Sequence, residues 1–432
     1  MSSNTPVVSK DVLLPFILIT SLFALWGFAN AVTDPMVSAF KKVLELENFQ
    51  ASLVQLAFYG GYFTMALPAA IFVRKYTYKK GVMVGLVLYA LGALLFYPAA
   101  VTQQFGFFLF GLYILTFGLA FLETTANPYI LSMGAESTAT QRLNLAQSFN
   151  PMGLLGGLLV AQQFVLRKLQ SDDVDFATLS ESAKATIRQA DLMVIRDPYV
   201  ALGLVVILVL VLIAFNKMPE SKDDHESLGV GESIKVLIQN RKYVEGVLAQ
   251  VFYVGAQIMV WTYIYQYAEA IGIANEIAGN YQFTAFILFF LGRFICTFLL
   301  KYLNSGMLLM YLAFAAAAFT LGTIFIEGMT GLYCLVGISF CMSLMFPTIY
   351  GIALEGLRPE ETKIGAAGLV MAIVGGALMP TFQGMILDIG GAGYTDTSIL
   401  GVSEVNFSFI LPFACFLLIA LYGRRVYTIF AD

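Results

Sequence analysis

The sequence predicts an all-α polytopic membrane protein with twelve transmembrane helices in two pseudo-symmetric six-helix bundles. Three observations carry this prediction. Hydrophobic residues make up 59% of the 432 residues and charged residues only 12%, whereas a soluble domain is about half apolar and about a quarter charged. The apolar residues gather in runs of about 20, the length that crosses a bilayer as a helix. The two halves of the chain also repeat one another.

Twelve apolar runs follow one another along the chain. They cover approximately residues 13–39, 50–73, 81–100, 105–130, 142–166, 198–216, 243–267, 279–300, 306–326, 330–353, 363–387 and 403–422. The first run is too long for a signal-peptide core and lacks a small-residue cleavage pattern, so we expect it to be retained.

Two connections between the runs are long. Residues 167–197 are acidic, and their part 178–195 has the pattern of a surface helix. Residues 217–242 are rich in charge and lie after six runs and before six more. We therefore predict an N-terminal six-helix bundle at 1–216, a cytoplasmic linker at 217–242 and a C-terminal six-helix bundle at 243–432.

The positions of Lys and Arg predict the orientation in the membrane. With the N-terminus inside, roughly 16 of the 24 Lys and Arg residues lie on the cytoplasmic side and roughly 7 outside, as the positive-inside rule requires. The cluster of Arg74, Lys75, Lys79 and Lys80 gives the strongest single indication. We expect both termini to be cytoplasmic.

Matching residues recur in the two halves at an offset of 219–221 residues. The pairs are Pro128 and Pro347, Glu136 and Glu355, Arg142 and Lys363, and Gly156-Gly157 and Gly375-Gly376. The second and eighth spans also end alike, in Lys75-Tyr76 and Lys301-Tyr302. A whole set of matches in register indicates duplication of a six-helix unit.

Glu123 is the candidate proton site. It falls near the middle of the fourth span, where an ionised carboxylate costs about 2.5–3.5 kcal/mol on insertion scales. Asn127 lies four residues on and therefore on the same helix face. Pro128 removes a backbone hydrogen bond and is expected to bend or loosen the helix close to the acid. An acid, an amide and a proline at membrane depth indicate a cavity that solvent reaches inside a helix bundle.

Two stripes of polar and aromatic residues face a predicted sugar site. Each stripe has a spacing of four, which places its members on one helix face. Trp26, Asn30 and Asp34 form the stripe of the first span, and Tyr253, Gln257 and Trp261 form that of the seventh. Carboxylates and amides pair with sugar hydroxyls, while an aromatic ring packs on the C–H face. Gln147 and Asn150 place further amides on the fifth span. Each amide could equally join two helices, and either tryptophan could serve packing.

Charged residues near the cytoplasmic ends of spans are predicted to form gate or inter-helix ion pairs. They are Glu136, Arg142, Arg293, Glu355 and Lys363. The pairs would break and form as the carrier changes conformation.

The sequence offers little for metal or covalent chemistry. All four cysteines lie inside apolar spans, and the single histidine, His225, lies in a charged loop. We therefore expect no disulfide, metal site or cofactor, and no enzyme activity, since a membrane-embedded enzyme needs nucleophiles, histidines or metal ligands.

The chain resembles the major facilitator superfamily and, within it, the fucose:proton symporter family. The motifs that carry the resemblance are residues 122–128 (LETTANP), 142–147 (RLNLAQ), 252–257 (FYVGAQ), 292–294 (GRF) and 346–348 (FPT). The resemblance covers nearly the whole chain. It implies alternating access, proton-driven uptake of a monosaccharide, and a functional pair of acids at Asp34 and Glu123. The chain departs from the family pattern at Ala31 and Phe346, so the resemblance indicates the mechanism more firmly than the sugar.

The predicted function is proton-coupled symport of a monosaccharide, L-fucose first, across the bacterial inner membrane. Glucose, galactose and N-acetylhexosamines stay open as substrates, and so do sodium-coupled and facilitative transport. The expected partners are the sugar, the proton and the lipid bilayer, without nucleic acid, and we expect the protein to act as a monomer.

Overall fold

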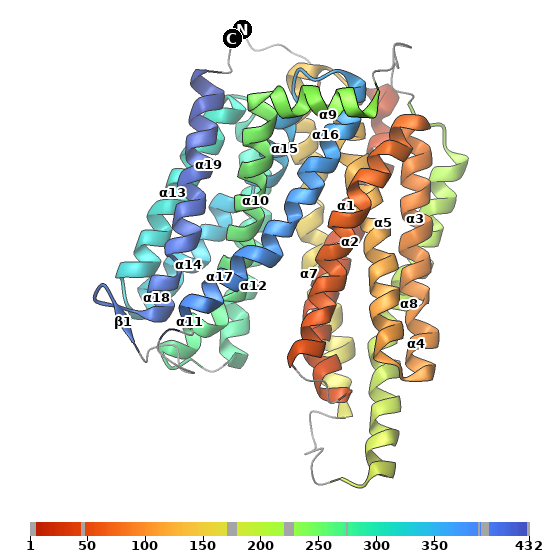
Figure 1. Ribbon diagram of the computed structural model, residues 1–432, viewed down its shortest axis with the longest axis vertical. Helices are drawn as coiled ribbons and strands as arrows, with labels where there is room; N and C mark the ends of the chain where they lie inside the picture. The colour runs from red at the N-terminus through yellow and green to blue at the C-terminus, as the bar shows by residue number, and fades with distance from the viewer. Residues whose placement is uncertain are drawn as a thin grey trace. The chain divides into compact units, whose positions relative to one another are not determined.

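The structure is a computed structural model that describes residues 6–44, 48–170, 179–219, 229–273, 275–387, 389 and 397–429. Its ribbon is almost entirely helical (Figure 1). The chain divides into two compact units, which are described one at a time. Unit 1 comprises residues 1–9, 130–148 and 223–432, and unit 2 comprises residues 10–129 and 149–222. Residues 130–148 thus pack with helices that follow the predicted linker. The predicted division at 217–242 stays a prediction.

Unit 2 holds the helices of the first half of the chain. They are η1 (Lys10–Val12), α1 (Leu13–Val43), α2 (Asn48–Lys75), α3 (Tyr78–Leu94), α4 (Phe96–Thr102), α5 (Phe105–Ser132, to Tyr129 in this unit), α7 (Asn150–Val160), η3 (Ala161–Val165), η4 (Leu166–Lys168) and α8 (Glu181–Phe215). The surface helix expected at 178–195 is the first half of α8, which continues into the sixth span without a break. Pro128 does not end α5, which runs on to Ser132.

Unit 1 holds the remaining helices. They are η2 (Glu136–Thr138), α6 (Ala139–Gln147), α9 (Val230–Gln239), α10 (Arg241–Thr262), α11 (Ile264–Ala270), α12 (Asn275–Leu299), α13 (Ser305–Phe325), α14 (Gly328–Met342), α15 (Met345–Leu354), α16 (Pro359–Met371), η7 (Ala372–Val374), α17 (Gly375–Leu387), α18 (Glu404–Ser408) and α19 (Ile410–Thr428). A short hairpin precedes α18, and each of its two strands, β1 (Ser398–Ile399) and β2 (Val402–Ser403), has two residues. Its turn places Leu400 and Gly401 at positive φ.

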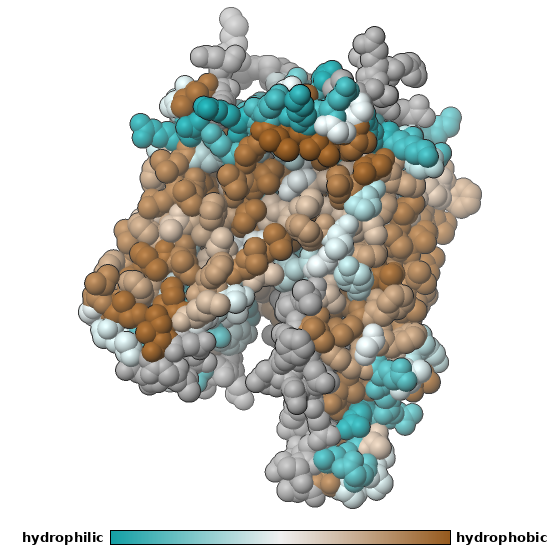
Figure 2. Space-filling view, in the orientation of Figure 1, coloured by the Kyte–Doolittle hydropathy of each residue, from teal (hydrophilic) through white to brown (hydrophobic). Residues whose placement is uncertain are grey.

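The helices have the length and surface of membrane spans. Ten helical segments of the described chain are long and apolar enough to cross a bilayer. α2 and the α6–α7 pair lie at the positions of the second and fifth predicted spans. Large apolar side chains are exposed along the outer helices, such as Phe314 and Phe325 on α13 and Leu421 on α19. Figure 2 shows apolar flanks on the helices of unit 1 and hydrophilic residues gathered at the end where α9 lies. This surface is that of an integral membrane protein.

Glycines bring the helix backbones into contact in both units. A Cβ added at Gly153 of α7 would lie 1.8 Å from the carbonyl oxygen of Ala24 in α1. A Cβ added at Gly375 of α17 would lie 2.1 Å from the carbonyl oxygen of Val251 in α10. The first and seventh spans therefore each pack on a glycine of the helix four spans later, in agreement with the predicted duplication. Small residues allow such close approach in membrane helices.

We expect Gly153→Ala to destabilise the protein, because the new methyl group meets backbone that cannot rotate away. Overpacking of this kind typically costs about 1–3 kcal/mol. Thermal unfolding of the purified protein in detergent measures the effect as a lower midpoint temperature. Gly106→Ala in α5 is the matched control, since a Cβ there meets nothing within 4 Å. Equal midpoints for the two variants would contradict the packing role of Gly153.

Candidate functional site

Glu123 is buried in unit 2, where the described residues provide no counter-ion for it. Its side chain is 4% exposed, and its buried Oε2 has no hydrogen-bond partner among the described residues. No ion pair of Glu123 with a lysine or arginine is found in that part of the chain. Thr124, Thr125 and Asn127, its neighbours on α5, are buried as well. Since burial disfavours the charged form of a carboxylic acid, this environment favours the protonated acid.

A tyrosine that sequence reasoning missed joins this region. The indole Nε1 of Trp26 donates a hydrogen bond of 2.7 Å to the hydroxyl of Tyr62 in α2. Both side chains are buried, and Phe23 stacks on the indole at 5.8 Å. This hydrogen bond joins α1 to α2. The sequence signal for Tyr62 was weak, because its helix shows no polar stripe.

The other predicted polar residues of unit 2 differ in their partners. Asn127 Nδ2 donates to the carbonyl oxygen of Glu123 at 3.0 Å. Asn150 Nδ2 donates to the carbonyl oxygen of Phe23 at 3.3 Å and so ties α7 to α1. The buried Oδ1 of Asn30 accepts no hydrogen bond from any described residue. Asp34 lies within α1, but its side chain is outside the described residues.

The first and last residues of the stripe on α10 donate hydrogen bonds to α14. Tyr253 is fully buried, and its hydroxyl donates to the carbonyl oxygen of Met342 at 3.1 Å. Trp261 is half-buried, and its Nε1 donates to Ser339 Oγ at 3.2 Å. Gln257 lies between them, half-buried, with no hydrogen bond to another described side chain or backbone group. Its amide is therefore available to a ligand.

Aromatic and amide side chains of α12 complete the surroundings of Trp261. Phe286 and Phe289 meet the indole edge-on, with ring centroids at 4.8 and 5.1 Å. Gln282 accepts a hydrogen bond of 2.7 Å from the hydroxyl of Tyr265. Sequence reasoning did not single out these three α12 residues, since they are dispersed among many aromatic residues in the eighth span.

Arg293 has an amide and an aromatic ring as neighbours instead of an acid. It is 3% exposed, and its Nη1 donates to the backbone oxygen and Oε1 of Gln147 at 3.3 and 3.4 Å. Its guanidinium lies over the ring of Phe289 at 4.9 Å. Gln147, predicted to bind sugar, thus contacts a residue predicted to gate. Both belong to unit 1, whereas Asn150 on the following helix belongs to unit 2.

Arg142 binds backbone oxygens at the end of α5. It is fully buried, Nε donates to Ile130 O at 2.8 Å, and Nη2 donates to Leu131 O at 2.5 Å. Its Nη1 reaches Ala135 O and Thr138 Oγ1. The guanidinium therefore caps carbonyls at the C-terminal end of α5, where a positive charge is favoured.

The remaining three predicted gate residues have different environments. Glu136 is exposed in η2. Glu355 at the end of α15 forms an ion pair with Lys242, with Nζ and Oε2 2.9 Å apart. Lys363 of α16 is 2% exposed. Of this predicted set, Glu355 joins two helices through an ion pair.

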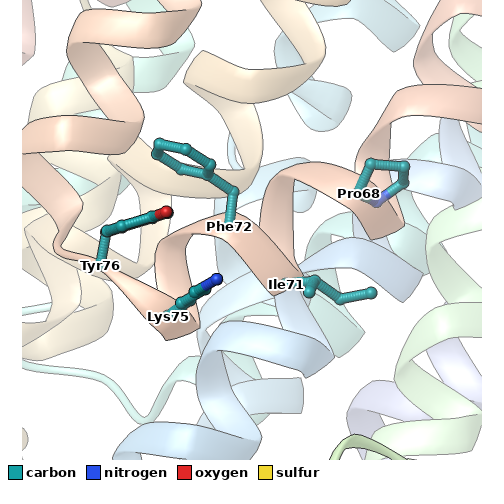
Figure 3. Close-up of a pocket in the computed structure, with 5 residues that line it drawn as sticks. All are labelled: Pro68, Ile71, Phe72, Lys75 and Tyr76. Atoms are coloured by element: carbon teal, nitrogen blue, oxygen red, sulfur yellow. The ribbon is translucent and has the colours of Figure 1, made fainter.

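The described residues hold no group of three His, Cys, Asp or Glu that could bind a metal ion. A surface hollow is present, but it is lined by four residues of α2 and by Tyr76, which follows that helix, and none of them belongs to the predicted sugar site (Figure 3).

Comparisons with known proteins agree with this architecture. Residues 17–380 match the Major Facilitator Superfamily. The L-fucose-proton symporter of Haemophilus influenzae is 55% identical over 99% of both chains, and that of Escherichia coli is 36% identical over 96% of this chain and 94% of its own. A glucose/galactose transporter of Brucella abortus is 30% identical over 94% of this chain and 92% of its own.

Solved structures give the same result. A crystal structure of the E. coli fucose:proton symporter superimposes with a TM-score of 0.86 at 34% identity and covers 96% of this chain and 99% of its own. A proton:xylose symporter matches with a TM-score of 0.69 at 14% identity, over 96% of this chain and 94% of its own, and supports the fold alone. The predicted twelve-helix fold is confirmed.

We expect Tyr62→Phe to lower stability, because Trp26 Nε1 would lose its acceptor inside the protein. An unsatisfied buried donor costs about 1–3 kcal/mol. Thermal unfolding of the purified protein measures the loss. Tyr311→Phe serves as the control, since Tyr311 is 58% exposed on α13. If the two variants unfold at the same temperature, the bond between Trp26 and Tyr62 contributes nothing measurable.

Proposed function

Because the chain belongs to the Major Facilitator Superfamily, we propose that it is a proton-coupled symporter that carries L-fucose into the cytoplasm by alternating access. The observation that carries the proposal is the 55% identity to an L-fucose-proton symporter over the full length of both chains. The buried acid of α5, which has no described counter-ion, supports proton coupling. We also propose that the protein lies in the bacterial inner membrane, with both termini cytoplasmic, and acts as a monomer.

Glu123 is the proton carrier in this proposal, with Asp34 as its functional partner. An ionised Glu123 would leave a charge in surroundings that provide no neighbouring cation, so the acid crosses only when neutral. Facing the outside, it takes a proton from water. After the carrier opens inward, the proton leaves to the cytoplasm. Each proton supplies about 2.3 kcal/mol per 100 mV and about 1.4 kcal/mol per pH unit, and each 1.4 kcal/mol allows roughly tenfold accumulation.

The sugar binds to the residues of both stripes. Gln257 has a free amide for sugar hydroxyls, and Trp261 offers a ring fixed by Ser339 and the two phenylalanines. Trp26 is held the same way by Tyr62 and Phe23. Asn30 has a carbonyl oxygen without a partner among the described residues, and this oxygen would accept from a sugar hydroxyl. Fixed aromatic rings with a few polar groups suit a pyranose, because its two faces differ in polarity. Asn127, Gln147 and Asn150 complete the proposed set.

The proposed cytoplasmic gate consists of the contacts between residues 130–148 and the later helices of unit 1. Asn144 Nδ2 donates to Thr348 Oγ1 at 3.1 Å, and Arg293 donates to Gln147. These contacts join neutral groups, or one cation and an amide, so breaking them separates no ion pair. Arg142 and Glu136 belong to residues 130–148, Glu355 follows α15, and Lys363 lies on α16. We assign the cytoplasmic gate to this set.

We expect Glu123→Gln to abolish pH-driven accumulation of L-fucose and to leave exchange of labelled for unlabelled sugar intact, because an amide is permanently neutral. Proteoliposomes with an imposed pH gradient measure both activities. Glu269→Gln, an exposed acid on α11, is the control and should accumulate sugar normally. Accumulation by Glu123→Gln at the control rate would refute the assignment.

The same vesicles separate the rival mechanisms. Replacement of sodium by choline should leave uptake unchanged, and an uncoupler should stop accumulation without stopping equilibration. A panel of labelled L-fucose, glucose, galactose and N-acetylglucosamine identifies the sugar, since glucose/galactose transporters are among the relatives.

We expect Gln257→Leu to weaken L-fucose binding about tenfold, because the variant loses one hydrogen bond to the sugar and leaves a hydroxyl unpaired. Isothermal titration calorimetry of the detergent-solubilised protein gives the dissociation constant. Gln239→Leu, at an exposed position of α9, is the control. An unchanged constant for Gln257→Leu would remove this residue from the site.

A further inference from the structure

The last two turns of α2 line a hollow of about 500 Å³ that is apolar along one part and cationic at the end (Figure 3). Pro68, Ile71 and Phe72 form the apolar part, and Lys75 and Tyr76 follow at the end of the helix. Ile71 is 41% and Tyr76 40% exposed. Apolar lining that leads to a cation and a phenol suits a ligand with a hydrocarbon chain and an anionic head.

Two lysines lie over the ring of Tyr76. Lys75 Nζ lies 5.6 Å and Lys80 Nζ 5.2 Å from the ring centroid of Tyr76, and the ring centroid of Phe72 lies 4.6 Å from that of Tyr76. Neither lysine forms an ion pair with an acid in the part of the chain that the structure describes. The sequence has no acidic residue between Glu47 and Glu123. The described residues thus provide no acidic partner for Lys75 or Lys80, and this helix end is positively charged.

The same arrangement of phenylalanine, lysine and tyrosine is found at the C-terminal end of α12. Lys301 Nζ lies 5.6 Å from the ring centroid of Tyr302, and Phe298 packs on that ring at 5.4 Å. Phe298 and Tyr302 are 60% and 64% exposed. Lys301, too, has no ion pair among the described residues, and no acid occurs between Glu276 and Glu327. Since phenylalanine, lysine and tyrosine recur at the same spacing in both halves, the arrangement belongs to the duplicated unit.

We propose that these two helix ends, at α2 and α12, each bind one anionic phospholipid. The phosphate lies against the lysine ammonium and the tyrosine hydroxyl, and an acyl chain follows the apolar side chains toward the membrane interior. Tyrosine is suited to the membrane–water interface because its ring is apolar and its hydroxyl polar. Each lysine near an anionic membrane surface strengthens binding roughly fivefold. A soluble anion would make no use of the apolar lining.

Native mass spectrometry of the full-length protein with phosphatidylglycerol tests the stoichiometry. The unaltered protein should retain two lipids, and phosphatidylcholine should not replace them. Lys75→Gln with Tyr76→Leu should retain one, Lys301→Gln with Tyr302→Leu should retain one, and all four changes together should retain none. The matched control, Lys235→Gln with Tyr311→Leu, removes one exposed lysine and one exposed tyrosine that do not contact each other. It should retain two lipids.

Retention of two lipids by a site variant, or equal loss in the control, would overturn the proposal. Thermal unfolding with added lipid is the second measurement. It compares the unaltered protein with a variant that combines Lys75→Gln and Lys80→Gln, which removes both charges and keeps the packing of Tyr76. Phosphatidylglycerol should raise the unfolding temperature of the unaltered protein more than that of this variant. An equal rise, or full competition by soluble glycerol phosphate, would also count against a lipid site. These outcomes are independent of sugar transport and do not bear on the proposed symport.

Discussion

The burial of a carboxylic acid without a charged partner is the constraint on which the proposed mechanism depends. Glu123 is 4% exposed, and its Oε2 has no partner among the described residues. A cation beside it would make the ionised form the stable one and would fix the charge in place. In the proposed mechanism, protonation of this acid decides whether it can move through an apolar environment. Desolvation would thus couple the acid to conformation.

The two buried arginines, Arg142 and Arg293, are stabilised by carbonyl oxygens, an amide and an aromatic ring. Arg142 donates to carbonyl oxygens at the end of α5, and Arg293 has the amide of Gln147 and the ring of Phe289. Ion pairs are found nearer the surface, as between Lys242 and Glu355. Breaking a buried ion pair is strongly unfavourable, by about 3–5 kcal/mol when one partner is lost. Bonds from a cation to neutral acceptors are weaker. They suit contacts that open in each transport cycle.

The sequence predicts the helices well and their partners poorly. Apolar runs, the positive-inside pattern and the repeat predict twelve spans, because each signal lies within one segment. The stripes of α1 and α10 are likewise visible, since helical spacing defines a face. Tyr62, Ser339 and Gln282 could not be selected, because their role comes from Trp26 and Trp261 on other helices. The prediction of ion pairs for Arg142 and Arg293 rested on charge alone, and the sequence does not reveal which carbonyls or amides come close.

The repeat places the two stripes on corresponding helices with the same close packing. Trp26 and Tyr253 are the first members of the two stripes, and Gly153 and Gly375 bring their partner helices against α1 and α10 in the same way. Such close backbone contact fixes the rotation of each helix, and with it the direction of the stripe. A stripe on a loosely packed helix would present its polar face to lipid in some rotations, at a cost of several kcal/mol per unpaired group. The glycine contacts therefore orient the polar residues, and the duplication gave both halves the same solution.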